Sequence, residues 1–173
     1  MARIAPDKLL LIAVLITLPM LGCKRQSGPQ IDDPAPVVEL RDFHGKNVQL
    51  PQDLKGKVWL IRFWSLECGF CDKDVLFGLD TLYQKYKDRG FEVVTVKVGE
   101  DDVRDERLKR FDRLSYPILI DERGIVARKF GVVGMPTTYI IDREGVLREK
   151  VVGEAGLNEF EKLFTTVLNK EDL

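Results

Sequence analysis

The stretch VWLIRFWSLECGFCDKD, residues 58–74, decides how this chain folds. It opens with VWLIRFW, a run rich in strand formers, which predicts a buried β-strand. From Cys71 onward apolar side chains recur at helical spacing as far as Tyr86, and Gly90 supplies a helix stop. Two cysteines, Cys68 and Cys71, are therefore expected where a strand ends and a helix begins.

This junction favours redox chemistry at the pair. Unpaired N–H groups and the positive end of the helix dipole stabilise an anion there, so a thiol ionises more readily. The thiolate is the nucleophile in disulfide exchange, and the Cys-x-x-Cys spacing lets the second sulfur close the ring. We expect Cys68, the N-terminal and more exposed member, to attack, and Cys71, one turn deeper, to resolve the mixed disulfide.

The segments around this stretch predict an α/β domain. Strands that alternate with helices imply a parallel core sheet, and a final hairpin adds an antiparallel edge. The other expected elements are an N-terminal β-hairpin (37–50), a buried strand (91–98), a mostly solvated helix (102–113), a short strand (116–121), a helical turn (128–132), an antiparallel hairpin (136–152) and a closing helix (157–168).

The composition of the 173 residues is that of one globular domain with a short appendage. Lys and Arg number 27 against 28 Asp and Glu, so no strong net field would attract nucleic acid or anionic lipid. We therefore expect no nucleic-acid partner. The scattered glycines and prolines argue against a disordered or repeat architecture.

The N-terminus has the pattern of an export signal. Arg3 and Lys8 precede LLLIAVLITL (9–18), which is too short to cross a bilayer core, since a helix needs about 20 residues for that. An N-terminal core helix is the alternative, but a polar stretch with prolines follows at once. The chain is expected to divide into a signal peptide (1–22), a flexible tether (23–36) and a folded domain (37–173).

The sequence PMLGC resembles the lipobox of bacterial lipoproteins, in which the cysteine receives lipid and becomes the mature N-terminus. This resemblance implies that Cys23 is a lipid anchor and that the domain lies outside the cytoplasm, at the periplasmic face of a bacterial membrane or at the cell surface. Three cysteines are an odd count for an exported protein, and acylation of Cys23 would leave one pair. An ordinary cleavable signal, which would leave Cys23 free or remove it, is the alternative.

Four segments resemble the thioredoxin superfamily: GKVWLIRFWSLECGFC, YPILID, FGVVGMPTTYIIDREG and the terminal helix. In particular they resemble its membrane-anchored, extracytoplasmic thiol-disulfide oxidoreductases of the TlpA type, which include reductases of cytochrome c maturation. The resemblance runs from about Pro36 to Leu168. It implies a thioredoxin-like fold, with a central mixed sheet flanked by helices and an N-terminal β-hairpin.

The same resemblance implies disulfide exchange with extracytoplasmic partner proteins, in which reduction is favoured over oxidation, and no cofactor. Apocytochrome c or its maturation factors are candidate partners, with a membrane electron donor. In that family the proline that matches Pro136 is cis and faces the dithiol, so that the residue before it can pair with an extended substrate. Met135 and Pro136 are thus assigned to substrate binding. A trans proline at the start of an edge strand is the alternative.

Three charged residues near the pair depart from the family pattern, and we expect them to tune it. Glu67 replaces an aromatic residue, and its carboxylate disfavours a thiolate at Cys68. Arg62 stands where relatives carry Asp or Asn; if it points inward, it would favour a thiolate at Cys71 and need an acidic partner. We hypothesise that this partner is Asp74. The alternative for Arg62 is a strand arginine that reaches solvent. The alternative for Asp74 is an acid in the first turn of the helix that the helix dipole favours.

Other uses of the cysteines have less support. A zinc site would need Cys23 and His44 beside the pair, and the sequence has no second close-spaced ligand pair, so we expect no metal. A peroxidase of this fold would carry Thr three residues before its reactive cysteine, where Ser65 stands. The second cysteine, Cys71, and the FW pair at residues 63–64 favour disulfide exchange over peroxide reduction. A thioredoxin-fold binding or accessory module with a structural cysteine pair stays open.

Overall fold

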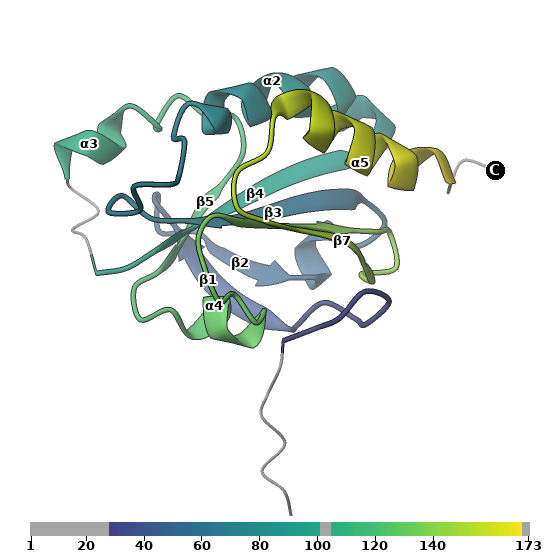
Figure 1. Ribbon diagram of the computed structural model, residues 1–173, viewed down its shortest axis with the longest axis horizontal. Helices are drawn as coiled ribbons and strands as arrows, with labels where there is room; N and C mark the ends of the chain where they lie inside the picture. Colours follow the sequence, from purple (N-terminus) through teal and green to yellow (C-terminus); the bar gives the residue numbers. More distant parts are fainter. Residues whose placement is uncertain (1–27, 101–104, 171–173) are drawn as a thin grey trace, which may run out of the picture.

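In the computed structural model, which describes residues 28–100 and 105–170, the chain forms a seven-stranded mixed sheet with helices on both faces (Figure 1). The strands are β1 Val38–Asp42, β2 Asn47–Leu50, β3 Val58–Trp64, β4 Phe91–Val98, β5 Ile118–Asp121, β6 Thr137–Ile141 and β7 Leu147–Val152. The helices are α2 Val75–Tyr86, α3 Glu106–Lys109, α4 Ile125–Lys129 and α5 Leu157–Lys170, with short 3-10 turns at Gln52–Leu54 and Lys87–Arg89. The strand order is β2-β1-β5-β4-β3-β6-β7. In Figure 1, α2 and α5 cover one face of the sheet and α4 covers the other.

Three parallel strands form the centre of the sheet. β3 pairs in parallel with β4, and β4 with β5. β6 runs antiparallel to β3, and β7 antiparallel to β6. The expected parallel core with an antiparallel edge is thus confirmed. Because the carboxyl ends of parallel strands meet at one edge of a sheet, the cysteine loop after β3 lies at the edge where β4 and β5 also end.

The N-terminal hairpin is also confirmed, and it extends the sheet. β1 pairs antiparallel with β2 and, through Arg41 and Asp42, with β5. The Asp42 carboxylate accepts hydrogen bonds from the backbone N–H groups of His44 and Lys46, both at 2.9 Å, which closes the turn between β1 and β2. His44 is therefore a turn residue.

β3 is buried along its whole length, and its side chains alternate between two hydrophobic cores. The core that α4 covers contains Trp59, Ile61 and Phe63. The core beneath α2 and α5 contains Val58, Leu60 and Trp64. Arg62 lies between Leu60 and Trp64 in the same alternation, so the strand directs a charged side chain to the face that α2 and α5 cover.

The helix after the cysteines begins at Val75, and the prediction that it begins at Cys71 is wrong. The Asp72 carboxylate accepts the backbone N–H of Asp74 at 2.9 Å, and such local bonds compete with the helical ladder. Both cysteines therefore lie in a loop before α2. Because the dipole effect falls off within the first turn of a helix, it acts on Cys68 less than the sequence implies.

Two further helical segments differ from prediction. Within the described residues, α3 is a single turn rather than a helix over 102–113. α4 lies earlier than the expected turn at 128–132, because the Asp121 carboxylate accepts the backbone N–H groups of Ile125 and Ala127 at 2.8 Å. These bonds satisfy two donors at the first turn of α4 and so fix where the helix begins.

The C-terminal part of the expected tether packs on the domain. Leu147 exchanges backbone hydrogen bonds with Asp32 and Asp33, at 2.8 and 2.9 Å. Ala35 is buried in the core that α4 covers. The prediction of a free tether is therefore wrong for residues 32–35, because backbone pairing with the start of β7 holds them in place.

The predicted signal peptide, Cys23 and the start of the tether lie outside the described residues. Export and lipid attachment thus stay predictions. Within residues 28–100 and 105–170, no helix has the length and apolar character needed to span a membrane.

Candidate active site

The two cysteines form a disulfide in the loop after β3. Their Cα atoms are 5.4 Å apart, and the Cys71 N–H donates to the Cys68 carbonyl at 3.3 Å, which closes a tight turn. Cys71 is only 5% exposed and packs in the core beneath α2 and α5, whereas Cys68 is partly exposed. One sulfur is thus accessible and the other shielded, an asymmetry that suits thiol-disulfide exchange.

The loop before β6 lies against the exposed cysteine. Cys68 Sγ is 3.4 Å from the carbonyl oxygen of Met135. The Met135–Pro136 peptide bond is cis, as the family resemblance implies. The Thr137 hydroxyl donates to the Gly134 carbonyl at 2.6 Å, which fixes the conformation of this loop. The structure thus brings the two residues assigned to substrate binding next to Cys68.

Arg62 is a fully buried cation on the same face of the sheet as Cys71. Its Nη2 donates to both carboxylate oxygens of Glu154 at 2.7 Å, and its Nη1 donates to Thr138 Oγ1 at 3.1 Å. The guanidinium carbon also lies 5.8 Å from the centre of the Phe160 ring. Burial lowers the pKa of the Arg62 guanidinium, and the Glu154 carboxylate opposes that shift. Since arginine stays protonated in proteins, the site contains a buried charge that one carboxylate compensates.

Glu154 is a site residue that sequence reasoning missed. It follows β7, and its Oε2 also accepts the backbone N–H of Asp72 at 3.0 Å. Asp72 is the residue directly after Cys71, so Glu154 links the buried arginine to the cysteine loop. The one sequence signal for such a residue was that Arg62, if buried, would need an acidic partner.

The two acids expected to tune the pair, Glu67 and Asp74, both bind arginines of the α3 segment. Glu67 Oε1 lies 2.8 Å from Arg107 Nη1, and Asp74 Oδ1 lies 2.8 Å from Arg110 Nη2. The hypothesised pair of Asp74 with Arg62 is therefore wrong, because the Asp74 side chain is 78% exposed and faces α3. The Arg107 charge offsets that of Glu67, so Glu67 disfavours a thiolate at the first cysteine less than expected.

Two large apolar side chains beside the pair face solvent. Phe70, which lies between the cysteines, is 86% exposed. Val133, two residues before Met135, is 91% exposed. Since Met135 lies against Cys68, the loops that carry these side chains meet at the disulfide. Exposed apolar surface of this kind is typical of an interaction site.

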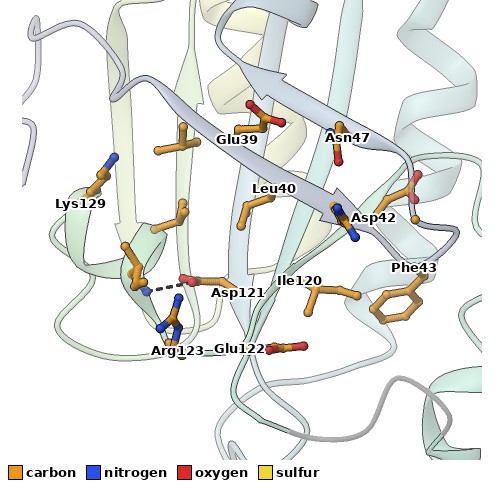
Figure 2. Close-up of a pocket in the computed structure, with 15 residues that line it drawn as sticks. Glu39, Leu40, Asp42, Phe43, Asn47, Ile120, Asp121, Glu122, Arg123 and Lys129 are labelled. Carbon is orange, nitrogen blue, oxygen red and sulfur yellow. Dashed lines mark hydrogen bonds between the residues drawn. The ribbon is translucent and has the colours of Figure 1, made fainter.

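A groove of about 680 Å³ lies away from the disulfide, between β1 and α4 (Figure 2). Charges of both signs line it, among them Glu39, Arg123 and Lys129. Figure 2 shows Asp121 bonded to the start of α4. Its carboxylate accepts backbone N–H groups of that helix and so stabilises the first turn. Nowhere in the described part of the chain could a group of three or more His, Cys, Asp or Glu side chains hold a metal ion.

Comparison with known proteins decides the family. The sequence model of the AhpC/TSA family matches residues 31–150. The chain belongs to the AhpC/TSA family. Thiol-disulfide oxidoreductase ResA of Bacillus cereus is 30% identical to this AhpC/TSA protein, over 87% of this chain and 86% of its own.

Solved structures agree with this assignment. A proposed thiol:disulfide interchange protein DsbE from Chlorobium tepidum has a TM-score of 0.72 and 28% identity, over 80% of this chain and 98% of its own. The thioredoxin domain of a thiol-disulfide oxidoreductase from Bacteroides vulgatus has a TM-score of 0.65 and 25% identity, over 83% of this chain and 99% of its own. The AhpC/TSA protein therefore has a thioredoxin-like fold and is a thiol-disulfide oxidoreductase, which confirms the resemblance to the TlpA type. These relatives do not favour the alternative, a binding or accessory module with a structural cysteine pair.

Proposed function

We propose that this oxidoreductase reduces disulfides in extracytoplasmic partner proteins, and that a lipid on Cys23 holds it at a membrane. The asymmetry of the pair carries the proposal: Cys68 is partly exposed beside Met135, whereas Cys71 is almost fully buried. The direction of electron flow rests on the resemblance to TlpA-type reductases.

The first step is attack by the reduced pair. The Cys68 thiolate attacks one sulfur of the partner's disulfide; a bond forms between these two sulfurs, the partner's S–S bond breaks, and the released thiolate takes a proton from water. Lys73 supports this role, because its ammonium group donates to the Cys68 carbonyl at 2.6 Å. A positive charge on the same loop favours the thiolate.

The second step releases the reduced partner. Cys71 loses its proton and attacks Cys68 Sγ, the Cys68–Cys71 disulfide forms again, and the partner's second thiolate leaves and is protonated. Two electrons have then passed from the pair to the partner. The separation of 5.4 Å between the two Cα atoms allows this bond without rearrangement of the backbone. An electron donor with a dithiol at the membrane would reduce the pair by the same steps in reverse.

The partner would bind across the two loops that meet at Cys68. An extended segment with a cysteine would lie along Met135 and Pro136, in the manner of strand addition. Apolar side chains of the partner next to that cysteine would pack on Phe70 and Val133.

The proposed location is the extracytoplasmic side of a bacterial membrane, at its periplasmic face or at the cell surface. The predicted signal peptide, the PMLGC sequence and the TlpA-type resemblance support it. Disulfides persist in such oxidising compartments, so a protein that reduces them needs electrons from a membrane donor. Apocytochrome c or its maturation factors are the candidate substrates that this resemblance suggests.

A mixed-disulfide trap tests the proposed function. In Cys71→Ala the resolving sulfur is missing, so partner proteins should accumulate as adducts on Cys68 in cells that express the full chain. Cys68→Ala is the matched control and should capture none. If no partner protein is bound to Cys68 in Cys71→Ala, or if both variants capture partners equally, the assignment of attacker and resolver is contradicted.

Anchoring and alternative chemistry need separate measurements. Labelled fatty acid should enter the wild-type protein and not Cys23→Ser, which should leave the membrane fraction. Consumption of hydroperoxide by the wild-type protein, faster than its reduction of a protein disulfide, would favour a peroxidase instead.

A further inference from the structure

One carboxylate connects the buried cysteine to the buried arginine. Glu154, in the linker between β7 and α5, accepts from Arg62 Nη2 at 2.7 Å through both of its oxygens. Its Oε2 also accepts the N–H of Asp72 at 3.0 Å. That N–H belongs to the peptide that joins Asp72 to Cys71, so the carboxylate holds the position of the resolving cysteine relative to β3.

The Glu154 carboxylate compensates the buried charge of Arg62. The Arg62 side chain has no exposed surface, and the Glu154 side chain is 31% exposed. Arg62 Nε has no hydrogen-bond partner among residues 28–100 and 105–170. A buried guanidinium that also lacks one bond is costly, and an acidic partner offsets much of that cost.

The exposed edge of Glu154 lines a groove of about 530 Å³ together with Asp72, Val75 and Leu157. Water can therefore reach the carboxylate but not the guanidinium. With Glu154 ionised, the arginine and the carboxylate together present no net charge to Cys71.

We propose that Glu154 is a positioning residue of the exchange site, which holds the peptide after Cys71 and cancels the Arg62 charge, and so sets how readily the disulfide is reduced. If the carboxylate charge is lost, the buried cation remains alone and stabilises the thiolates of the reduced pair. If the arginine is lost, the carboxylate remains and disfavours them. The two losses therefore shift the equilibrium in opposite directions, which a general loosening of the loop would not do.

The test is the thiol-disulfide equilibrium of the Cys68–Cys71 pair with glutathione, measured in the full chain. Glu154→Gln keeps an oxygen that can accept from Asp72 and removes the charge. It should shift the equilibrium about tenfold towards the reduced pair, which corresponds to about 30 mV for two electrons. Arg62→Met should shift it towards the disulfide. Glu159→Gln, an exposed acid in the first turn of α5, is the matched control and should leave the equilibrium unchanged.

The double variant Arg62→Met/Glu154→Gln removes both charges, and its equilibrium should return close to the wild-type value. If Glu154→Gln alone folds poorly, the test is the comparison of the double variant with Arg62→Met: removal of the carboxylate charge should reverse the shift towards the disulfide, and an equal shift in both variants would overturn the proposal. Shifts of the same sign in the two single variants, or no shift in either, would overturn the proposal. Glutathione replaces the natural partner, so the result does not depend on partner identity or on the direction of electron flow.

Discussion

The unequal burial of Arg62 and Glu154 predicts an unequal effect of removing each on the free energy of unfolding. Glu154→Leu leaves a guanidinium with no exposed surface and no acid, and loss of one partner of a buried pair costs about 3–5 kcal/mol. Arg62→Met leaves a carboxylate that is already 31% exposed and can be hydrated. It loses mainly the hydrogen bond to Thr138 and contact with Phe160, so we expect a cost of about 1–2 kcal/mol.

The double variant Arg62→Met/Glu154→Leu replaces the ion pair with apolar side chains. Such replacements are often neutral, so its stability should lie within about 1 kcal/mol of the wild-type value. The two single substitutions are therefore expected to be strongly non-additive, because each removes the partner that makes the other charge tolerable.

Urea denaturation of the oxidised full chain, followed by tryptophan fluorescence, measures these differences without the added salt of guanidinium chloride. In thermal unfolding, Glu154→Leu should lower Tm by about 6–20 °C, since about 1 kcal/mol shifts Tm by about 2–4 °C for a protein of this size. Glu159→Leu is the matched control and should have little effect. The reasoning is refuted if Arg62→Met is as destabilising as Glu154→Leu, or if the double variant loses the sum of the two single effects.

Three further predictions concern the docking surface, a helix contact and a buried phenol. Val133→Ser should raise KM for a protein disulfide several-fold and leave the rate with a small disulfide unchanged, because the Val133 side chain is 91% exposed; an equal loss with both substrates would contradict a docking role. Gly78→Ala should destabilise the protein by about 1–3 kcal/mol despite a better helix propensity, because the new Cβ would lie 2.2 Å from Leu157 Cδ1. The double variant Gly78→Ala/Leu157→Ala should relieve that clash, which urea denaturation measures as a recovered free energy of unfolding. A double variant less stable than both single variants would show that the contact is not the cause. Burial raises the pKa of Tyr139 from about 10 to about 12, so the unfolded chain releases this proton first and stability should fall as pH rises from about 10 to about 12. Tyr139→Phe should flatten that part of the pH profile, and an unchanged slope would show that other groups cause the loss of stability.

The strands and helices could largely be predicted because each carries its own local signal. The apolar run of β3, the β-branched residues of β4 and the apolar face of α5 each mark an element without reference to the others. The approach of Met135 to Cys68 could be predicted only through the family resemblance, because it depends on how β6 lies beside β3.

The partner of Arg62 could not be predicted, because tertiary pairing selects it. Glu154 is 92 residues away in the sequence and reaches Arg62 only because β6 lies beside β3 and β7 lies beside β6. The same carboxylate binds the Asp72 N–H in the loop before α2, where a helix from Cys71 was expected. The long-range contact therefore underlies the error in the acidic partner, whereas the local bond from the Asp74 N–H to the Asp72 carboxylate underlies the error in the start of the helix.

Reversible exchange at Cys68–Cys71 is the property on which the proposed mechanism and the role of Glu154 both depend. The most direct measurement equilibrates the native full chain in glutathione buffers of increasing reducing ratio, traps free thiols and locates them by peptide mass. We predict one reversible two-electron transition in which Cys68 and Cys71 become labelled together. If the two cysteines of the native protein stay joined, or stay unlinked, at all glutathione ratios, this prediction is contradicted.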